Sequence, residues 1–307
     1  VFGGAPTGVP ASGLPLKGGA EKYVSTGSAE NRIKCPAGRI YHKVSKALFP
    51  FAGHDRCAKK FRGGLMSNRQ DIHNSDLPVI CRSCEARHRG ICGALAPDQL
   101  FNLAKHTTRR VLPPGTSLLS DSNEIRTYSN IMAGVAKLTK ALPDGRQQIV
   151  GLQFAPDLIG RPFKTESTID AEAATDLSVC SFPKSALDRM IKETPELEHR
   201  LLQQALNELD EARSWMVTLG RKTAAEKVAS FLWLIATHAN PETATAGRSL
   251  TFDLPLTRAD IADFLGLTIE TVSRQMTKLR KENVITIENN RHVTVHDLDR
   301  LERRACL

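Results

Sequence analysis

Apolar positions near the end of the chain recur at helical spacing on either side of a glycine. Two stripes of residues three or four positions apart flank Gly266: Ile261, Phe264 and Leu265 before it, and Val272, Met276 and Leu279 after it. Thr257 and Thr268 precede the two stripes, where a side-chain hydroxyl can cap a helix, and Asp260 follows Thr257 at capping-box spacing. The pattern predicts two short helices joined by a glycine-containing turn.

Short alternating runs occupy the middle of the chain. Stretches such as VLPPGTSLL, GVAKLTKALPDGRQQIVGLQF and TDLSVCSF are punctuated by glycine, proline and aspartate, which predicts short strands. Pro143-Asp144-Gly145 interrupts the second stretch and predicts a hairpin turn. These strands predict a small antiparallel barrel or roll from about 95 to 183. A short helix is suggested just before them by Asp98, Leu100, Phe101, Leu103 and Ala104.

A second hairpin is predicted close to the C-terminus. The stretch VITIENNRHVTVHD alternates about Asn289-Asn290, a dipeptide that favours tight hairpin turns. It follows the two-helix unit directly, so it would be the wing of a winged helix. Upstream, Thr223 and Glu226 are spaced to cap the preceding helix, AEKVASFLWLIATHA.

A long helical seam connects the roll to this C-terminal unit. Apolar residues recur in steps of three and four: Leu197, Leu201, Ala205, Leu209, Ala212, Met216 and Leu219. Such a seam favours pairing with a partner helix, and we expect Leu197, Leu201, Leu209, Ala212 and Met216 to form the dimer contact. Packing against the chain's own roll is the alternative, and one long helix can do both.

The predicted fold class is therefore α+β, with an N-terminal β-roll, a long dimerisation helix and a C-terminal winged helix-turn-helix. The corresponding segments are an N-terminal extension (1–65), a cysteine-rich segment (66–94), the roll (95–185), the long helix (186–220) and the winged unit (221–307).

Composition sets the N-terminal 65 residues apart from the rest. They contain eleven of the 21 glycines and carry a net charge of +8 out of the chain's +9, so the overall charge says little about the remainder. Such a segment cannot bury enough apolar surface to offset its ordering entropy. One interpretation is a disordered basic arm that touches DNA backbone. The interpretation we favour is translated upstream sequence with Met66 as the true start, which gives Cys35 and Cys57 no role.

No apolar run approaches the length of a membrane span, and no secretory segment is recognisable near the N-terminus, so we expect a cytoplasmic protein with no membrane partner. Seven unevenly spaced cysteines argue against a secreted disulfide framework and for ligand or redox use.

The second helix of the two-helix unit carries polar groups opposite its apolar stripe. Glu270, Ser273, Arg274 and Lys278 lie on that side, the first three within its first two turns. Glutamate and arginine four positions apart can contact the edges of a G·C pair, and lysine suits phosphate. This arrangement predicts entry into the DNA major groove. A helical hairpin with a merely solvated charged face, including a surface Glu270–Arg274 ion pair, is the alternative.

Three cysteines lie within twelve residues. Cys81 and Cys84 form a C-x2-C turn, Cys92 follows after seven residues, and a fourth thiol must come from Cys180 or Cys306. Cys180 is the better candidate because it lies on a predicted strand opposite Leu177 and Val179. Soft thiolates suit an iron–sulfur cluster or zinc, and a Cys81–Cys84 disulfide switch is a third possibility.

The cysteine segment ICRSCEARHRGICGAL, the roll hairpin, the long helix and LTRADIADFLGLTIETVSRQMTKLRKENVI together resemble the Crp/Fnr regulators over about 78 to 300. Within that family the cysteines are similar to the FNR-type, FnrL/AadR-like oxygen sensors. The resemblance implies one [4Fe-4S] cluster per subunit on Cys81, Cys84, Cys92 and Cys180. It also implies a homodimer, RNA polymerase as a partner, and inverted TTGAT half-sites in double-stranded DNA. The enterobacterial protein has five residues between the second and third ligands, where this chain has seven.

The cyclic-nucleotide branch is not expected. Its Arg-Ser phosphate pair has no counterpart in DLIGRPFKTESTIDAEAATD, so no cyclic nucleotide should bind. A family member that senses another signal, through a disulfide, zinc or a small ligand, is the main alternative. An iron–sulfur electron-transfer protein is a distant one, and nothing in the sequence indicates a catalytic acid–base pair, so we expect no enzyme.

Overall fold

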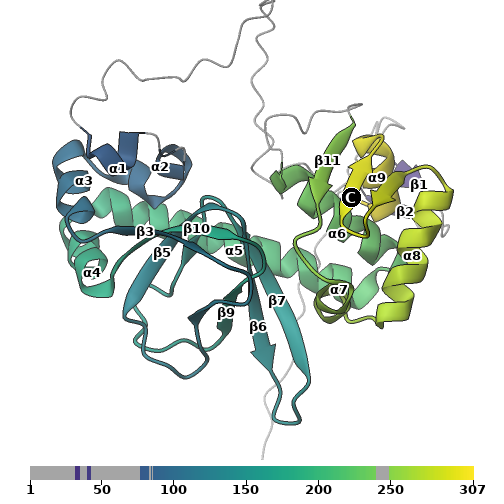
Figure 1. Ribbon diagram of the computed structural model, residues 1–307, viewed down its shortest axis with the longest axis horizontal. Coiled ribbons are helices and arrows are strands. Elements are labelled where there is room, and N and C mark those ends of the chain that lie inside the picture. Colours follow the sequence, from purple (N-terminus) through teal and green to yellow (C-terminus); the bar gives the residue numbers. More distant parts are fainter. Residues whose placement is uncertain (1–31, 35–39, 43–76, 83, 85, 240–248) are drawn as a thin grey trace, which may run out of the picture.

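Two antiparallel sheets face each other in the N-terminal half of the molecule. In the computed structural model, which describes residues 32–34, 40–42, 77–82, 84, 86–239 and 249–307, the sheets have the strand orders β3-β10-β5-β8 and β4-β9-β6-β7 (Figure 1). The strands are β3 Thr108–Leu112, β4 Ser117–Leu119, β5 Thr127–Ala133, β6 Val135–Ala141, β7 Gln147–Phe154, β8 Leu158–Ile159, β9 Asp170–Ala173 and β10 Leu177–Pro183. The roll predicted from alternation is confirmed.

Strand alternation places the core of this roll between the sheets. On β10, Leu177 and Val179 are buried and face the core. Cys180 follows Val179, points to the opposite face of the strand and is half-buried. The predicted turn joins β6 to β7, where Gly145 has a φ of +86° that an L side chain rarely adopts. The hairpin therefore forms where the sequence indicated it.

Short helices precede the roll. They are α1 Val79–Arg82, α2 Ala86–Arg89, the 3-10 helix η3 Ile91–Ala94, and α3 Pro97–Ala104. The helix predicted near residues 97–104 is confirmed, with Pro97 in its first turn, where a missing N–H costs nothing. Ile91 in η3 is fully buried in the same apolar cluster as the roll core. The cysteine-containing segment is thus packed onto the roll and is not a separate appendage.

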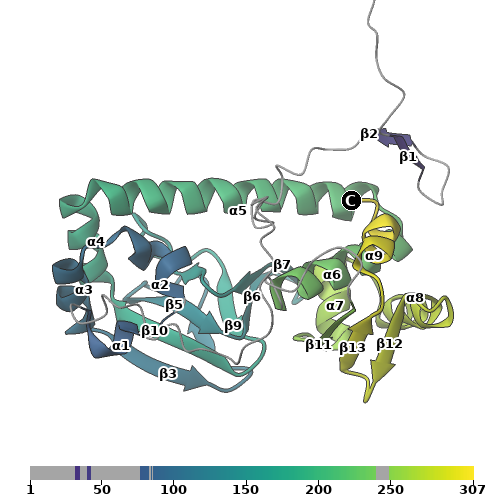
Figure 2. The ribbon, with the colours of Figure 1, turned by 90° about the horizontal axis from the view of Figure 1, so that it is seen from above.

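The long helix is shorter at its start than the sequence indicated. We expected one element from 186 to 220, but the structure has α4 Lys184–Glu193 and α5 Pro195–Arg221, separated at Thr194. Pro195 disfavours the α conformation for the residue before it, and Thr194 has φ −133° and ψ 93°. Figure 2 shows α5 running along one side of the molecule, past both the roll and the C-terminal helices.

The C-terminal part is a winged helix-turn-helix, as predicted. Its elements are α6 Ala224–Ala239, β11 Leu250–Asp253, α7 Arg258–Leu265, α8 Ile269–Lys281, β12 Ile285–Glu288, β13 His292–Val295 and α9 Leu298–Ala305. The strands pair in the order β11-β13-β12. Asn289 and Asn290 both have positive φ, 49° and 57°, as a two-residue hairpin turn of type I′ requires.

The roll and the winged helix share apolar contacts. Ile149 and Phe154 of β7 belong to the same buried cluster as the C-terminal helices. Phe154 stacks on His238 of α6 with ring centroids 4.3 Å apart, and Trp215 of α5 meets Phe264 of α7 at 4.6 Å. The C-terminal unit therefore packs against β7 and α5 together.

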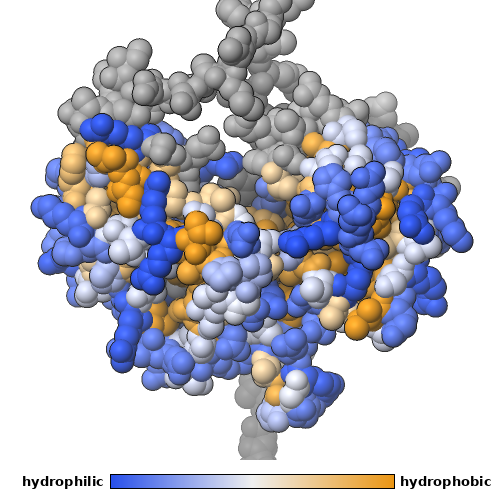
Figure 3. Space-filling model, viewed as in Figure 1, coloured by the Kyte–Doolittle hydropathy of each residue, from blue (hydrophilic) through white to orange (hydrophobic). Residues whose placement is uncertain are grey.

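The N-terminal extension is described only in part. Strands β1 Arg32–Lys34 and β2 Ile40–His42 pair antiparallel, whereas Cys35, Cys57 and Met66 lie outside the described residues. Within the described part of the chain, no helix is long and apolar enough to cross a membrane. On the face shown in Figure 3, hydrophilic residues surround smaller apolar patches.

Candidate nucleic-acid interface and cysteine centre

Local hydrogen bonds fix both helices of the helix-turn-helix. The Thr257 hydroxyl accepts from the Asp260 N–H at 3.1 Å, and the Thr257 N–H donates to the Asp260 carboxylate at 3.2 Å, a complete capping box. Gly266 closes α7 with φ +59°, and the Thr268 hydroxyl accepts from the Thr271 N–H at the start of α8. These contacts set the angle at which α8 leaves the turn.

The outer face of α8 carries the residues expected to contact DNA. Glu270, Arg274 and Lys278 are exposed and Ser273 is half-buried, whereas Val272, Met276 and Leu279 are buried beneath them. Side chains of this face line a shallow open groove: Ser273, Arg274, Thr277, Lys278 and Lys281. The structure thus puts the four predicted residues on one accessible side of a helix that is anchored on the other.

The charges on this face suit base and phosphate contacts. Hydrogen bonding from its own backbone N–H and from the Thr268 side chain lowers the pKa of Glu270, which keeps its carboxylate ionised and accepting. The alternative Glu270–Arg274 ion pair is not among the ion pairs of the described residues. Lys278 and Lys281 follow one turn later on the same side.

Three cationic side chains donate hydrogen bonds to backbone carbonyls within the winged helix-turn-helix. The sequence analysis did not identify them. Arg300 of α9 donates to the Glu282 carbonyl at the end of α8 at 2.8 Å. Lys227 of α6 donates to the Leu265 carbonyl at the end of α7 at 3.1 Å. Arg258 reaches the Asn290 carbonyl in the wing turn at 3.4 Å. Two of these contacts satisfy carbonyls that a helix end leaves without partners.

Four cysteines from separate segments come together beside the roll. Cys81 lies in α1, Cys84 between α1 and α2, Cys92 in η3 and Cys180 on β10. They are close enough that the charge of Cys180, Cys81 and Cys84 each raises the pKa of Cys92. Cys81 and Cys84 likewise act on Cys180. These are the four thiols that the sequence singled out, and each of Cys81, Cys84 and Cys180 acts electrostatically on Cys92.

Burial has the largest effect on the acidity of Cys92 and Cys180. Desolvation, followed by the neighbouring thiolates, raises the pKa of Cys92 to about 12, and the same two causes raise the pKa of Cys180 to about 11. Arg109, the cross-strand neighbour of Cys180 on β3, opposes the shift at Cys180.

One polar side chain enters this centre from the roll. Asn130 of β5 is the cross-strand partner of Cys180, and its Nδ2 lies 3.3 Å from the Cys92 sulfur. No local pattern in the sequence indicates this contact, because Asn130 and Cys92 are 38 positions apart and meet only in the folded chain.

The donor set is all sulfur and largely buried, which suits a soft, thiolate-ligated iron centre. Across the parts of the chain that the structure describes, no three His, Cys, Asp or Glu side chains form a group that could hold a metal ion. The four thiols fit an iron–sulfur cluster by chemical type.

The apolar seam of α5 divides between two environments. Leu197 and Leu201 are buried in the core of the chain's own roll, at 0% and 6% exposure, so our expectation that they face a partner is corrected. Ala212, Leu209 and Met216 are exposed, the last at 71%. Other apolar residues of the same helix join them on the surface: Leu202, Leu206 and Val217. Spacing alone could not separate these two faces of one amphipathic helix.

Comparison with known proteins identifies the family. A profile described as a Crp-like helix-turn-helix domain matches residues 226–304. A probable transcriptional activator of Rhizobium leguminosarum bv. viciae is 62% identical over 235 residues, which is 76% of this chain and 97% of that protein. The transcriptional activator protein FnrL of Cereibacter sphaeroides is 41% identical over 234 residues, covering 75% of this chain and 94% of that protein. The chain belongs to the Crp/Fnr family.

The fold of this Crp/Fnr protein agrees with solved structures. FixK2 from Bradyrhizobium japonicum superimposes with a TM-score of 0.57 and 29% sequence identity, covering 64% of this chain and 96% of that one. Family membership makes the chain a DNA-binding transcriptional regulator and not an enzyme. The winged helix at residues 226–304 is its DNA-binding part.

Proposed function

We propose that this Crp/Fnr regulator senses oxygen through one [4Fe-4S] cluster per subunit, held by Cys81, Cys84, Cys92 and Cys180. The observation that supports the proposal is that Cys180 of β10 lies beside the cysteine segment: its cross-strand partner Asn130 reaches the sulfur of Cys92 at 3.3 Å. The 41% identity to FnrL supports the same assignment.

A bound cluster would supply an oxygen-reactive centre, and the chain's own residues would hold it and transmit its loss. The four cysteines must be thiolates to ligate iron, and Arg109 beside Cys180 offsets part of their charge. Asn130 contacts Cys92 from the roll side.

The contact between the cysteine segment and α5 offers a route to the dimer seam. Ile91, next to Cys92, lies in one buried cluster with Leu197 and Leu201 at the start of α5. Arg200 of α5 donates to the Arg89 carbonyl at 2.6 Å. A shift of η3 would therefore displace the start of α5. We propose that the exposed apolar face of α5 forms the homodimer contact.

The output is activation of genes used under low oxygen. We propose that the dimer binds inverted TTGAT half-sites in double-stranded DNA through Glu270, Ser273, Arg274 and Lys278, and contacts RNA polymerase from there. Because the proposed target is chromosomal DNA, we propose that the protein acts in the cytoplasm, with no membrane partner. No cyclic nucleotide is required.

Anaerobic purification of the full chain tests this function. We expect a visible cluster absorbance with iron and acid-labile sulfide in equal amounts, about four of each per subunit, and loss of both in air. Zinc without sulfide would instead identify the zinc-stabilised alternative. A Cys81–Cys84 disulfide that forms in air, with no iron in the anaerobic protein, would identify the redox switch.

A further inference from the structure

Asn130 occupies an unusual position for a buried amide. It is 5% exposed, and its Nδ2 donates to the Cys92 sulfur at 3.3 Å. Its Oδ1 is buried and has no hydrogen-bond partner. Burying an amide oxygen without a hydrogen-bond partner costs free energy of folding. The hydrogen bond from Nδ2 to the Cys92 sulfur is the favourable contact that this orientation of the amide provides.

The location of Asn130 joins two of the four thiols. It is paired with Cys180 across strands β5 and β10 while its side chain reaches Cys92 of η3. An amide N–H can only donate, so its partner sulfur must accept, which a thiolate does better than a thiol. The arrangement is therefore suited to the ligated form of Cys92 more than to its protonated form.

We propose that Asn130 is a positioning residue that stabilises the reduced, more negatively charged form of the cluster by donating a hydrogen bond to the Cys92 ligand. This inference rests on the proposed cluster. A hydrogen bond to a ligating sulfur withdraws electron density from it and raises the reduction potential. The side chain would thereby slow oxidation of the cluster by oxygen.

Asn130→Leu tests the inference because it keeps the volume and removes the donor. Asn130→Ala removes the donor with a different change in packing, so a common effect of both variants is due to the lost hydrogen bond. Ser129→Ala is the matched control: it deletes the buried 2.8 Å hydrogen bond between Ser129 and Ser181 in the adjacent pair of the same two strands, away from the thiols.

The readouts are the midpoint potential, the half-life of the cluster absorbance in air, and the Fe–S stretching bands in resonance Raman spectra. We expect both Asn130 variants to have a more negative potential, a half-life shortened several-fold, and Fe–S bands at higher frequency. Ser129→Ala should match the wild type in all three. A merely structural role of Asn130 would not move the Fe–S bands selectively.

The outcomes separate the two proposals. A wild type that binds no iron and sulfide would refute the proposed function itself. A wild type with a full cluster, together with Asn130 variants that have full iron and sulfide content and unchanged potential, half-life and Fe–S bands, would overturn the role of Asn130 alone. Equal changes in the Asn130 variants and in Ser129→Ala would also overturn it.

Discussion

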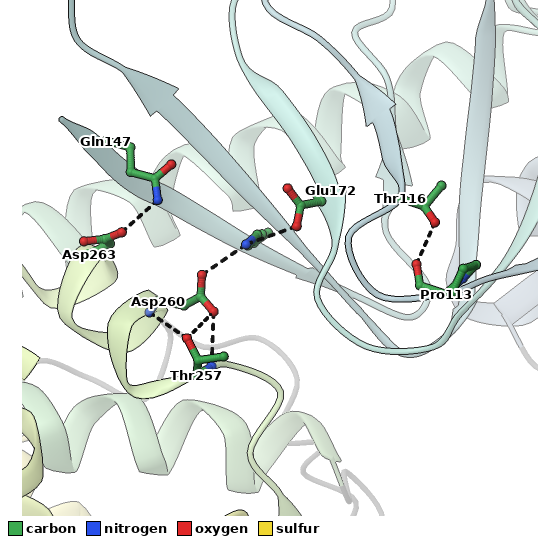
Figure 4. A network of polar contacts seen from close by, with 8 residues as sticks. Pro113, Thr116, Gln147, Glu172, Thr257, Asp260 and Asp263 are labelled. Carbon is green, nitrogen blue, oxygen red and sulfur yellow. Dashed lines mark hydrogen bonds and ion pairs between the residues drawn. The ribbon is translucent and has the colours of Figure 1, made fainter. Parts of the chain in front are cut away.

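Lys137 on β6 places its ammonium 3.0 Å from the carboxylate of Asp260. That carboxylate completes the capping box of α7 with Thr257 (Figure 4). Glu172 of β9 lies 3.2 Å from the same ammonium. Gln147 of β7 donates to Asp263 at 2.9 Å, and Gln148 donates to the Phe264 carbonyl at 3.1 Å. Residues of the roll therefore make polar contacts with both ends of α7, the first helix of the helix-turn-helix.

We expect Lys137→Met to lower the free energy of unfolding by about 1–2 kcal/mol, because it leaves two partly buried carboxylates without their cation. Lys140→Met on the same strand removes a more exposed ion pair with Asp121 and should lower the free energy of unfolding less than Lys137→Met does. Denaturant titration of the full chain measures both. Introducing Lys137→Met into Asp260→Asn protein should cost less than in the wild type; equal costs would show that the two residues do not interact.

Serine substitutions test the ligand set. Replacing any one of Cys81, Cys84, Cys92 and Cys180 should abolish the anaerobic absorbance and the DNA-binding response, since a cubane needs four thiolates. Cys306→Ser is the control and should retain both. Iron and sulfide analysis of each variant checks the prediction, and a full cluster in Cys180→Ser would disprove the fourth ligand.

The divided seam of α5 predicts two kinds of variant. Leu209→Asp and Met216→Asp should weaken the anaerobic dimer, because dimerisation would bury an unpaired charge. Leu197→Ala should instead destabilise the fold by roughly 2–5 kcal/mol with little effect on dimer dissociation, since Leu197 is buried in its own roll.

Sedimentation of anaerobic and air-exposed protein completes that test. We expect dimers in the first state and mostly monomers in the second. Equal dimer fractions in both states would contradict control of the seam by oxygen.

Base readout is tested at α8. Arg274→Ala should cost about 1–3 kcal/mol at the cognate site and relax the preference for guanine there. Lys278→Ala should weaken binding to all sequences alike and flatten the salt dependence, as expected for a phosphate contact. Titrations with cognate and random duplexes at several salt concentrations distinguish them. If Arg274→Ala weakened both duplexes by the same factor, direct readout by this residue would be excluded.

Asp157 gives the stability of the roll a pH dependence. Burial, and then the charges of Glu208 and Glu211 on α5, raise its pKa to about 7, although its carboxylate accepts from the Phe154 N–H at 3.0 Å. A carboxyl whose folded-state pKa exceeds its unfolded value stabilises the fold at low pH, and that contribution is lost as the pH rises from about 4 to about 7.

Asp157→Asn should remove this contribution to the pH dependence. The variant accepts the same hydrogen bond without a charge, so it should become more stable than the wild type as the pH rises from 5 to 8. The gain should be on the order of 1–3 kcal/mol. Denaturant titrations across that range measure the difference, and a difference that stays constant with pH would rule out Asp157 as its source.

Local signals in the sequence were enough to predict several elements. Thr257 with Asp260, Gly266, and Asn289 with Asn290 each act on backbone within four residues, so the helix-turn-helix and its wing could be predicted in place. The four cysteines could be named as candidate cluster ligands in the same way, because residue type and spacing are enough to indicate a thiolate site.

Features that depend on residues far apart in the chain could be seen only in the folded protein. The seam of α5 has one apolar period, and only packing against the roll buries Leu197 while leaving Met216 exposed. The contacts of Asn130 with Cys92 and of Lys137 with Asp260 depend on strand register and on the docking of the winged helix. Their energies come from burial and close approach in three dimensions, which no periodicity along the sequence encodes.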